Sequence, residues 1–252
     1  MRALVVSDIH GNLQALEAVL AAAGPFDELW NLGDIVGYGA NPNEVINVIR
    51  KLRPLATVSV RGNHDRVCCG LSTSQGFNPV AAQAAAWTER HLTAENLEWL
   101  RALPQGPLAA SERVMVAHGS PLHEDHYIVS MRDAWTPLQR MATEITFFGH
   151  THVQGGFSQQ PPEWQEIRPL YRLHDQPEQY ILDVPQGTRH LINPGAVGQP
   201  RDADWRAAFA LYNSSSEQVT FHRIPYDIAA AQAAIREAAL PDRLASRLSS
   251  GR

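Results

Sequence analysis

The stretch Arg2-Ala-Leu-Val-Val-Ser-Asp-Ile-His-Gly-Asn12 decides how the rest of the chain is interpreted. Its apolar run predicts a buried β-strand, and the strand ends in a carboxylate, Asp8, and an imidazole, His10. Gly11 and Asn12 suit a tight turn and a helix cap, and an amphipathic segment follows them. Two metal-ligating side chains therefore lie where a strand passes into a helix, which is the usual ligand-binding edge of an open α/β sheet.

Strand and helix signals continue to alternate along the first two thirds of the chain. Short apolar or β-branched runs predict strands at residues 4–6, 28–32, 56–60, 114–117 and 145–148. Periodic apolar residues predict helices at 13–23, at 42–52 with Pro54 ending it, and at 79–103 with a break near Thr93. The initial β-α-β-α-β order implies a largely parallel, buried sheet.

The last third of the chain is less regular. Residues 154–190 are polar and rich in proline, which predicts irregular loops and edge strands. Residues 208–212 and 218–224 predict a hairpin, and residues 228–240 predict a helix. The sequence contains no repeat and no linker, so we expect one domain over residues 1–252.

The overall composition excludes several classes of protein. A net charge of −5 argues against a general nucleic-acid binder or a protein of anionic membranes. No apolar run is long enough for a membrane span or a signal peptide, which predicts a cytoplasmic protein. The cysteines, Cys68 and Cys69, are neighbours and make no disulfide framework. We expect two small buried residues there, with a redox or extra metal role as the alternative. The composition does not predict an oligomeric state.

Polar residues of three types recur after the predicted strands. Taken singly, each has an ordinary explanation as a helix cap, a turn or a hydrogen-bonded histidine. Together they follow five separate strands with a glycine alongside: Asp8 and His10, then Asp34, then Asn63 and His64, then His118, then His150 and His152. The carboxyl ends of parallel strands meet at one edge, so these groups can converge. Pairs spaced by two residues would also project to one side of an extended backbone.

The residue types indicate which ions such a site would hold. Asp, Asn and His together suit Mn²⁺, Fe²⁺, Co²⁺, Ni²⁺ or Zn²⁺, and the absence of thiolates from these motifs argues against a structural zinc site. Two Asp, one Asn and four His, leaving His64 aside, make seven candidate ligands, too many for one tetrahedral ion. They are about right for two divalent transition-metal ions that share a carboxylate.

At this point the sequence resembles the calcineurin-like metallophosphoesterases. The motifs that carry the resemblance stand in order as Asp8-Ile-His10, Gly33-Asp34, Gly62-Asn63-His64-Asp65, His118-Gly119 and Gly149-His150-Thr-His152. Asp8-Ile-His-Gly-Asn12, Gly33 to Gly39 and Asn193 to Arg201 are more narrowly similar to the small prokaryotic phosphodiesterase branch. The resemblance implies a single-domain α/β fold, a four-layer α/β/β/α sandwich. Residues 186–225 would complete its second sheet, and residues 226–252 would form a C-terminal helix and tail.

The resemblance also implies a role for each motif residue. Asp8, His10, Asp34 and His152 would hold one metal ion, and Asp34, Asn63, His118 and His150 the second, with Asp34 bridging. A water or hydroxide that bridges the ions would attack phosphorus. His64 would act as a general acid or stabilise the transition state, with Asp65 orienting its ring. Asn63, Arg201 and Asn12 would contact the substrate, although Arg201 could be a solvated surface residue and Asn12 a helix cap.

The expected function is metal-dependent hydrolysis of phosphodiesters or phosphomonoesters of small or nucleotide-like substrates. A phosphoprotein phosphatase is a weaker alternative, because the stretch from Gly33 to Gly39 lacks the arginine with which those relatives grip phosphate. A dinucleoside polyphosphate hydrolase stays open. A non-catalytic scaffold would typically have lost ligands that are all present here. Metal storage or sensing would leave His64 and Asp65 unexplained.

Overall fold

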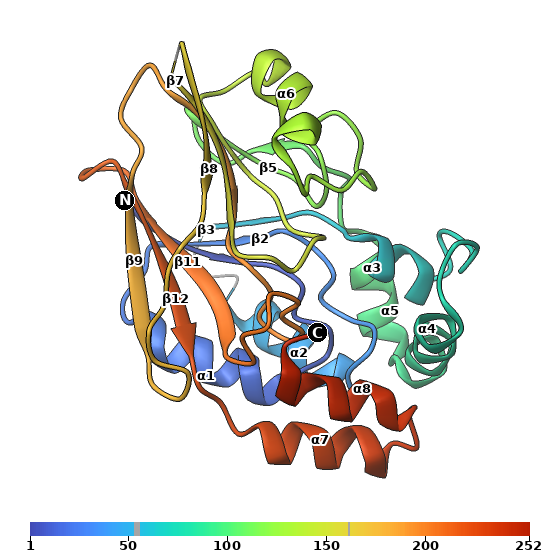
Figure 1. Cartoon of the computed structure of the whole chain (residues 1–252). Helices are drawn as coiled ribbons and strands as arrows, with labels where there is room; N and C mark the ends of the chain where they lie inside the picture. Colours follow the sequence, from blue (N-terminus) through green and yellow to red (C-terminus); the bar gives the residue numbers. More distant parts are fainter. Residues whose placement is uncertain (53–55, 161) are drawn as a thin grey trace.

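The structure is a computed structural model that describes residues 1–52, 56–160 and 162–252. In this part of the chain, two six-stranded sheets lie face to face with helices outside them (Figure 1). Pro54, which was predicted to end a helix, lies outside the described residues.

The first sheet combines the N-terminal strands with strands from the last third of the chain. Its order is β3-β2-β1-β11-β12-β9, where β1, β2 and β3 are parallel and the remaining pairs are antiparallel. The strands are β1 (Arg2–Val6), β2 (Glu28–Asn31), β3 (Ala56–Ser59), β9 (Glu178–Asp183), β11 (Ala207–Asn213) and β12 (Gln218–Ile224).

The second sheet has the order β4-β5-β6-β10-β7-β8, with β5, β6 and β10 parallel to one another. Its strands are β4 (Leu108–Ala109), β5 (Val114–Val116), β6 (Ile145–Phe147), β7 (Gly155–Gln160), β8 (Glu163–Ile167) and β10 (Arg189–Asn193). Each sheet thus contains a block of three parallel strands, and the site loops leave the carboxyl ends of those strands.

The apolar run of β1 explains why the sheets pack in layers. Ala3 and Val5 lie in the core between the two sheets, whereas Leu4 and Val6 lie in the core under the helices. Because successive side chains of a strand point to opposite faces, a strand covered on both sides needs an uninterrupted apolar run.

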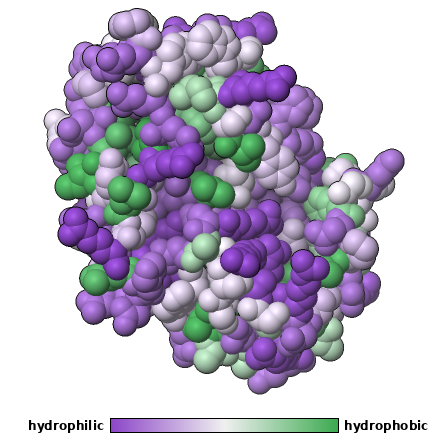
Figure 2. Space-filling model, viewed as in Figure 1, coloured by the Kyte–Doolittle hydropathy of each residue, from purple (hydrophilic) through white to green (hydrophobic). Residues whose placement is uncertain are grey.

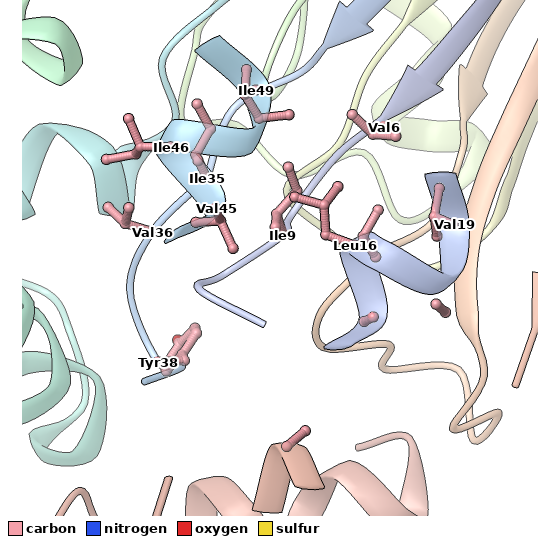
Figure 3. Packing of buried hydrophobic residues seen from close by; sticks show 14 of the residues in the cluster. Val6, Ile9, Leu16, Val19, Ile35, Val36, Tyr38, Val45, Ile46 and Ile49 are labelled. Carbon is pink, nitrogen blue, oxygen red and sulfur yellow. The ribbon is translucent and has the colours of Figure 1, made fainter. Parts of the chain in front are cut away.

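The helices are α1 (Leu13–Ala23), α2 (Pro42–Lys51), α3 (Asn63–Cys68), α4 (Pro79–His91), α5 (Ala94–Arg101), α6 (Met131–Arg140), α7 (Ile228–Glu237) and α8 (Asp242–Ser246), followed by the 3₁₀ turn η1 (Arg247–Ser250). Leu16 of α1 and Val45 of α2 pack with Ile9 and Ile35 of the strand-end loops beneath the first sheet (Figure 3). Leu138 of α6 packs on the outer face of the second sheet. The α/β/β/α sandwich is confirmed.

Two predictions about the last third of the chain were wrong in part. Residues 154–190 contain the regular strands β7, β8 and β9; β8 and β9 are edge strands, as predicted, but β7 lies inside its sheet. Residues 186–225 do not all complete the second sheet, because β10 joins it but β11 and β12 extend the first. The reason is burial: six of the seven residues of β11 are buried, which suits an interior position beside β1.

The surface in Figure 2 is largely hydrophilic, with hydrophobic residues in small groups. In the described part of the chain, no helix combines the length and the apolar character that a membrane crossing requires.

Candidate metal centre

Loops from both sheets bring the predicted site residues together. The first sheet contributes the side chains that follow β1, β2 and β3, and the second contributes those that follow β5 and β6. In chain order these residues are Asp8, His10, Asp34, Asn63, His118, His150 and His152, and all but Asn63 are buried. The centre therefore lies where the carboxyl edges of the two sheets meet.

The ligand loops have an unusual backbone conformation. Asp8, His10, Asp34, His150 and His152 all have left-handed φ angles, between 50° and 66°. The expectation that paired residues share one side of an extended backbone is therefore wrong. This conformation costs an L-residue about 1 kcal/mol, and such strain is concentrated at functional sites. Hydrogen bonds between the β1 and β2 loops hold it, including His10 N to Asp34 O at 2.9 Å.

At two motif positions glycine is required because another loop packs directly against its backbone, and not because the chain turns there. A Cβ atom on Gly62 would lie 2.0 Å from Oδ1 of Asp34, and one on Gly149 would lie 1.9 Å from Oγ of Ser7. Only glycine lets these loops pack directly against the carboxylate-bearing loops.

The first ligand group contains Asp8, His10, Asp34 and His152. Each offers one ligand atom, and these four atoms all lie within 4.8 Å of one another. Nε2 of His10 is 3.7 Å from Oδ2 of Asp34, and Nε2 of His152 is 3.3 Å from Oδ1 of Asp8.

The second ligand group contains Asp34, His118 and His150, with ligand atoms again within 4.8 Å of one another. Nε2 of His118 lies 3.5 Å from Oδ2 of Asp34 and 3.1 Å from Oδ1 of Asn63. Asn63, the remaining residue of the second predicted set, therefore lies next to this group. Asp34 belongs to both groups, so its carboxylate lies between the two.

Backbone carbonyls fix the orientation of all four imidazoles. Nδ1 of His10, His118 and His152 contacts the carbonyl oxygens of Val36, Leu32 and Gln199 at 3.1, 2.9 and 2.6 Å. His150 contacts the carbonyl of Asp125 through Nε2 at 3.2 Å. A ring nitrogen that faces a carbonyl must carry the proton, which leaves the other nitrogen directed into the centre. Histidine ligands of metals are held in this way.

The centre contains polar atoms that lack partners. Nε2 of His10 and Nε2 of His152 face each other at 3.2 Å, and both are acceptors if Nδ1 carries the proton. The buried Oδ1 of Asp8 has no hydrogen-bond partner in the described structure. Facing lone pairs beside a buried carboxylate oxygen are what a cation would satisfy, so the residues present fit divalent metal ions.

The pKa values of the buried side chains also indicate that a positive charge would stabilise the centre. Burial raises the pKa of Asp8 to about 7, and burial lowers the pKa of His10 and His152 well below the usual range. Although burial opposes the shift, the carboxylate of Asp34 raises the pKa of His118 to about 9. This shift favours a protonated His118 beside Asp34 when no metal is bound. A metal ion at this position would release that proton.

His64 lies beside the ligand groups without joining them. Its ring packs against His10, Tyr38 and Phe77, with centroids 4.9, 4.4 and 4.5 Å away. Its Nδ1 is buried and has no partner among the described residues. Burial lowers the pKa of His64 to about 4.

Asp65 does not orient the ring of His64, so that prediction was wrong. One carboxylate oxygen of Asp65 accepts from the backbone N–H of Val36 and the other from that of Gly62. The second contact closes a capping box at the start of α3. Asp65 therefore holds the loop geometry, and it does so by joining the β2 and β3 loops.

Arg201 points toward the centre. Its guanidinium donates to Gln199 Oε1 at 3.0 Å and lies 5.8 Å from the centre of the Tyr38 ring, while its Nε is buried and unpaired among the described residues. The positive charge of Arg201 contributes to the lowered pKa of His10 and His152. The buried Nε disagrees with the alternative of a fully solvated surface residue.

Asn12 is a helix cap, and the structure gives no support to its predicted contact with substrate. Its Oδ1 accepts from Ala15 N at 3.1 Å at the start of α1. Its Nδ2 donates to the carbonyl of Gly198 at 2.9 Å. Both polar groups are already engaged.

Cys68 and Cys69 are buried free thiols outside both ligand groups. Burial raises the pKa of each, which makes the reactive thiolate scarce. The prediction of two small buried residues is confirmed.

Tyr127 is a site neighbour that the sequence did not reveal. Its ring stacks on His150 with centroids 3.9 Å apart, yet half of the residue is exposed. Together with Phe77 and Asn63 it lines a cavity of about 460 Å³ beside the second ligand group. No sequence signal could have found Tyr127, because it lies in an irregular loop after β5 that matches no motif.

A comparison with known families now agrees with this geometry. The profile of the calcineurin-like phosphoesterase superfamily domain matches residues 1–217. The chain belongs to this superfamily. Metal dependence and hydrolysis of phosphoric esters are properties of this family, so the chain is a calcineurin-like phosphoesterase that carries a candidate Asp and His metal site. The predicted family, fold and class of reaction are confirmed.

Individual relatives of this phosphoesterase extend the comparison. It is 34% identical to an uncharacterized protein of Methanocaldococcus jannaschii, covering 98% of this chain and 97% of the relative. The crystal structure of a metallophosphoesterase from Sphaerobacter thermophilus is 42% identical with a TM-score of 0.84, covering all of both chains. A symmetrical bis(5'-nucleosyl)-tetraphosphatase of Glaesserella parasuis is 35% identical over 41% of this chain and 39% of its own.

Proposed function

We propose that this phosphoesterase holds two divalent transition-metal ions and hydrolyses phosphodiester or phosphomonoester bonds of small or nucleotide-like substrates. The observation that carries the proposal is the position of Asp34, whose carboxylate belongs to both ligand groups. Asp8, His10 and His152 would complete one set, and Asn63, His118 and His150 the other. Mixed nitrogen and oxygen ligands suit Mn²⁺, Fe²⁺, Co²⁺, Ni²⁺ or Zn²⁺.

Two ions held at these positions would supply Lewis acidity and would activate a water as the nucleophile. The chain supplies orientation and further charge. Carbonyl contacts fix each imidazole, and the guanidinium of Arg201 pairs with phosphate oxygens that do not react. His64 lies next to His10 and, as a neutral imidazole, stabilises the transition state by donating a hydrogen bond.

The cavity lined by Tyr127, Phe77 and Asn63 receives the organic part of the substrate. Its volume of about 460 Å³ is within the ordinary range of small-molecule sites. The exposed face of Tyr127 offers a surface for an aromatic group such as a nucleobase. Access from solvent and this size favour a small phosphorylated molecule over a folded protein partner.

Dinucleoside polyphosphate hydrolysis is the second candidate. The partial match to a tetraphosphatase favours it, although that match covers less than half of either chain. A phosphoprotein phosphatase is less well supported, because Tyr38 in the β2 loop occupies the position of the arginine with which those relatives grip phosphate. A cytoplasmic location stays a prediction from the sequence.

The test measures metal content and turnover together. Protein stripped with a chelator and reloaded with Mn²⁺ or Ni²⁺ should bind two ions per chain and hydrolyse a chromogenic phosphodiester. Asp34→Asn should bind fewer than one ion and lose turnover, because one carboxylate serves both groups. The matched control is Asp183→Asn, whose carboxylate accepts from Gln218 on the surface. A wild-type stoichiometry of one ion, or no metal-dependent turnover with any ion, would overturn the proposal.

A further inference from the structure

A second cavity lies near the metal centre, between the start of α4 and the C-terminal segment. It has a volume of about 680 Å³. Residues of α4 (teal in Figure 1) and of the C-terminal α8 and η1 contribute to its lining. The lining contains Asn78 and Pro79 at the start of α4, Tyr38, and three arginines from the C-terminal segment: Arg243, Arg247 and Arg252.

The cavity is positively charged. Of the described residues that line it, none is acidic. Among the residues that the structure describes, no Asp or Glu side chain forms an ion pair with Arg243 or Arg247, and Arg247 Nε donates to the backbone oxygen of Arg252. Arg236 on the neighbouring α7 differs, because it is paired with Asp242 at 2.8 Å. Burial and the nearby charge of Arg201 lower the pKa of Arg247.

Tyr38 connects this cavity to the metal centre. The guanidinium carbon of Arg247 lies 6.0 Å from the centre of the Tyr38 ring, and that of Arg201 lies 5.8 Å from it. The same ring is in edge contact with the ring of His10, with centroids 4.7 Å apart. One aromatic ring therefore separates a ligand of the first group from the arginines of the cavity.

The wall opposite the arginines also favours negative charge. Helix α4 has 13 residues and begins at the cavity with Pro79 in its first turn. The positive end of the helix dipole therefore lies at the cavity. The arginines come from residues beyond the part of the chain that the superfamily profile matches, which ends at residue 217.

We propose that Arg243 and Arg247 bind a second phosphate group of the substrate, so that the enzyme acts on esters that carry at least one phosphate beyond the one attacked at the metal centre. The proposal rests on the proposed function, whose substrate class it narrows to polyphosphorylated compounds. Guanidinium groups bind phosphate oxygens through paired hydrogen bonds. Tyr38 and Arg201 would lie along the path between the two phosphates.

The first experiment compares two substrates. The double variant Arg243→Ala/Arg247→Ala should lower kcat/KM for diadenosine tetraphosphate at least tenfold. It should change kcat/KM for bis(p-nitrophenyl) phosphate, which has one phosphate, less than twofold. Arg236→Ala, which removes a paired surface arginine, should change neither. An equal loss for both substrates, or no loss for the tetraphosphate, would overturn the proposal. The Arg→Lys double variant should recover part of the loss, because it keeps the charge.

The second experiment needs no turnover. Chelated, metal-free protein is titrated with inorganic triphosphate in a calorimeter. The wild type and Arg236→Ala should bind it, and the Arg243→Ala/Arg247→Ala variant should bind at least tenfold more weakly. Equal binding by all three proteins, or no binding by the wild type, would contradict the proposal. If the wild type binds triphosphate but hydrolyses no ester with any metal, the proposed function fails while the anion site stands.

Discussion

The Nε2 atoms of His10 and His152 lie 3.2 Å apart, although the two residues belong to loops of different sheets. Each ring has its Nδ1 directed at a backbone carbonyl, so each directs a lone pair at the other. This contact is unfavourable in the metal-free protein and becomes favourable when both nitrogens face a cation. Folding therefore prepares the rings for a ligand at a cost to the stability of the empty protein.

Metal addition should accordingly stabilise the fold. An ion at one hundred times its Kd adds about 2.7 kcal/mol per site to the free energy of unfolding. For a chain of this size that corresponds to a rise in Tm of roughly 5–10 °C. The check is the Tm of chelated protein with and without Mn²⁺. His10→Ala/His152→Ala should lose at least half of the rise; an unchanged rise would exclude these two residues as ligands.

Replacement of His64 by Ala should lower kcat on a chromogenic phosphodiester by roughly 10²–10³-fold, because a positioned hydrogen-bond donor to the transition state typically contributes that factor. Both metal ions should stay bound, since the side chain of His64 lies outside both ligand groups. Metal analysis of the purified variant distinguishes the two effects. Loss of an ion would show that His64 is a ligand instead.

Replacement of Gly62 by Ala should damage metal binding without touching a ligand side chain. The added Cβ would lie 2.0 Å from Oδ1 of Asp34, so that carboxylate must move. We expect both ions to be lost or bound at least tenfold more weakly. Gly76→Ala is the control, because its Cβ would meet nothing within 4 Å. That control should cost about 1 kcal/mol of stability at its positive φ and leave metal content intact.

Replacement of Asn12 by Ala should act on stability rather than on catalysis. It removes the cap of α1 and should lower the free energy of unfolding by about 1 kcal/mol, whereas Asn12→Asp keeps the capping oxygen and should cost less. Urea unfolding measures this effect. The KM of each variant should stay within twofold of the wild type; a large rise in KM at unchanged stability would restore the substrate role.

Acid should destabilise the protein partly through His190, which lies outside the centre. Burial lowers the pKa of His190 to about 4, below the ordinary 6.5. The unfolded chain therefore binds the proton first, and stability falls as pH drops from 6.5 toward 4, by up to about 3 kcal/mol. His190→Gln should lose less stability than the wild type between pH 7 and pH 4.5 in urea titrations. His174→Gln, at an exposed position, should follow the wild type.

The strand ends and motif residues could be predicted because their signals are local. A buried strand followed by Asp8 and His10 specifies both an element and a site. Sheet membership of β11 and β12 could not be predicted, because an apolar hairpin fits either sheet until its partner strand is known.

The contact partners of Asp65 were missed for a similar reason: both of its hydrogen bonds join different loops. Tyr127 and Arg247 reach the site through tertiary packing alone, so no spacing in the sequence indicates them.

The division of the centre between two sheets has a mechanical consequence. The first ligand group joins Asp8 of one sheet to His152 of the other, and the second joins Asp34 to His118 and His150. Bound ions would thus cross-link the two sheets. A shift of one sheet relative to the other would lengthen the bonds between the ions and their ligands. The distance between the sheets is set by the apolar layer between them, where Trp30 packs on Phe147 with centroids 5.8 Å apart. Substitutions in this layer, remote from the ligands, should therefore change the affinity for the metal ions.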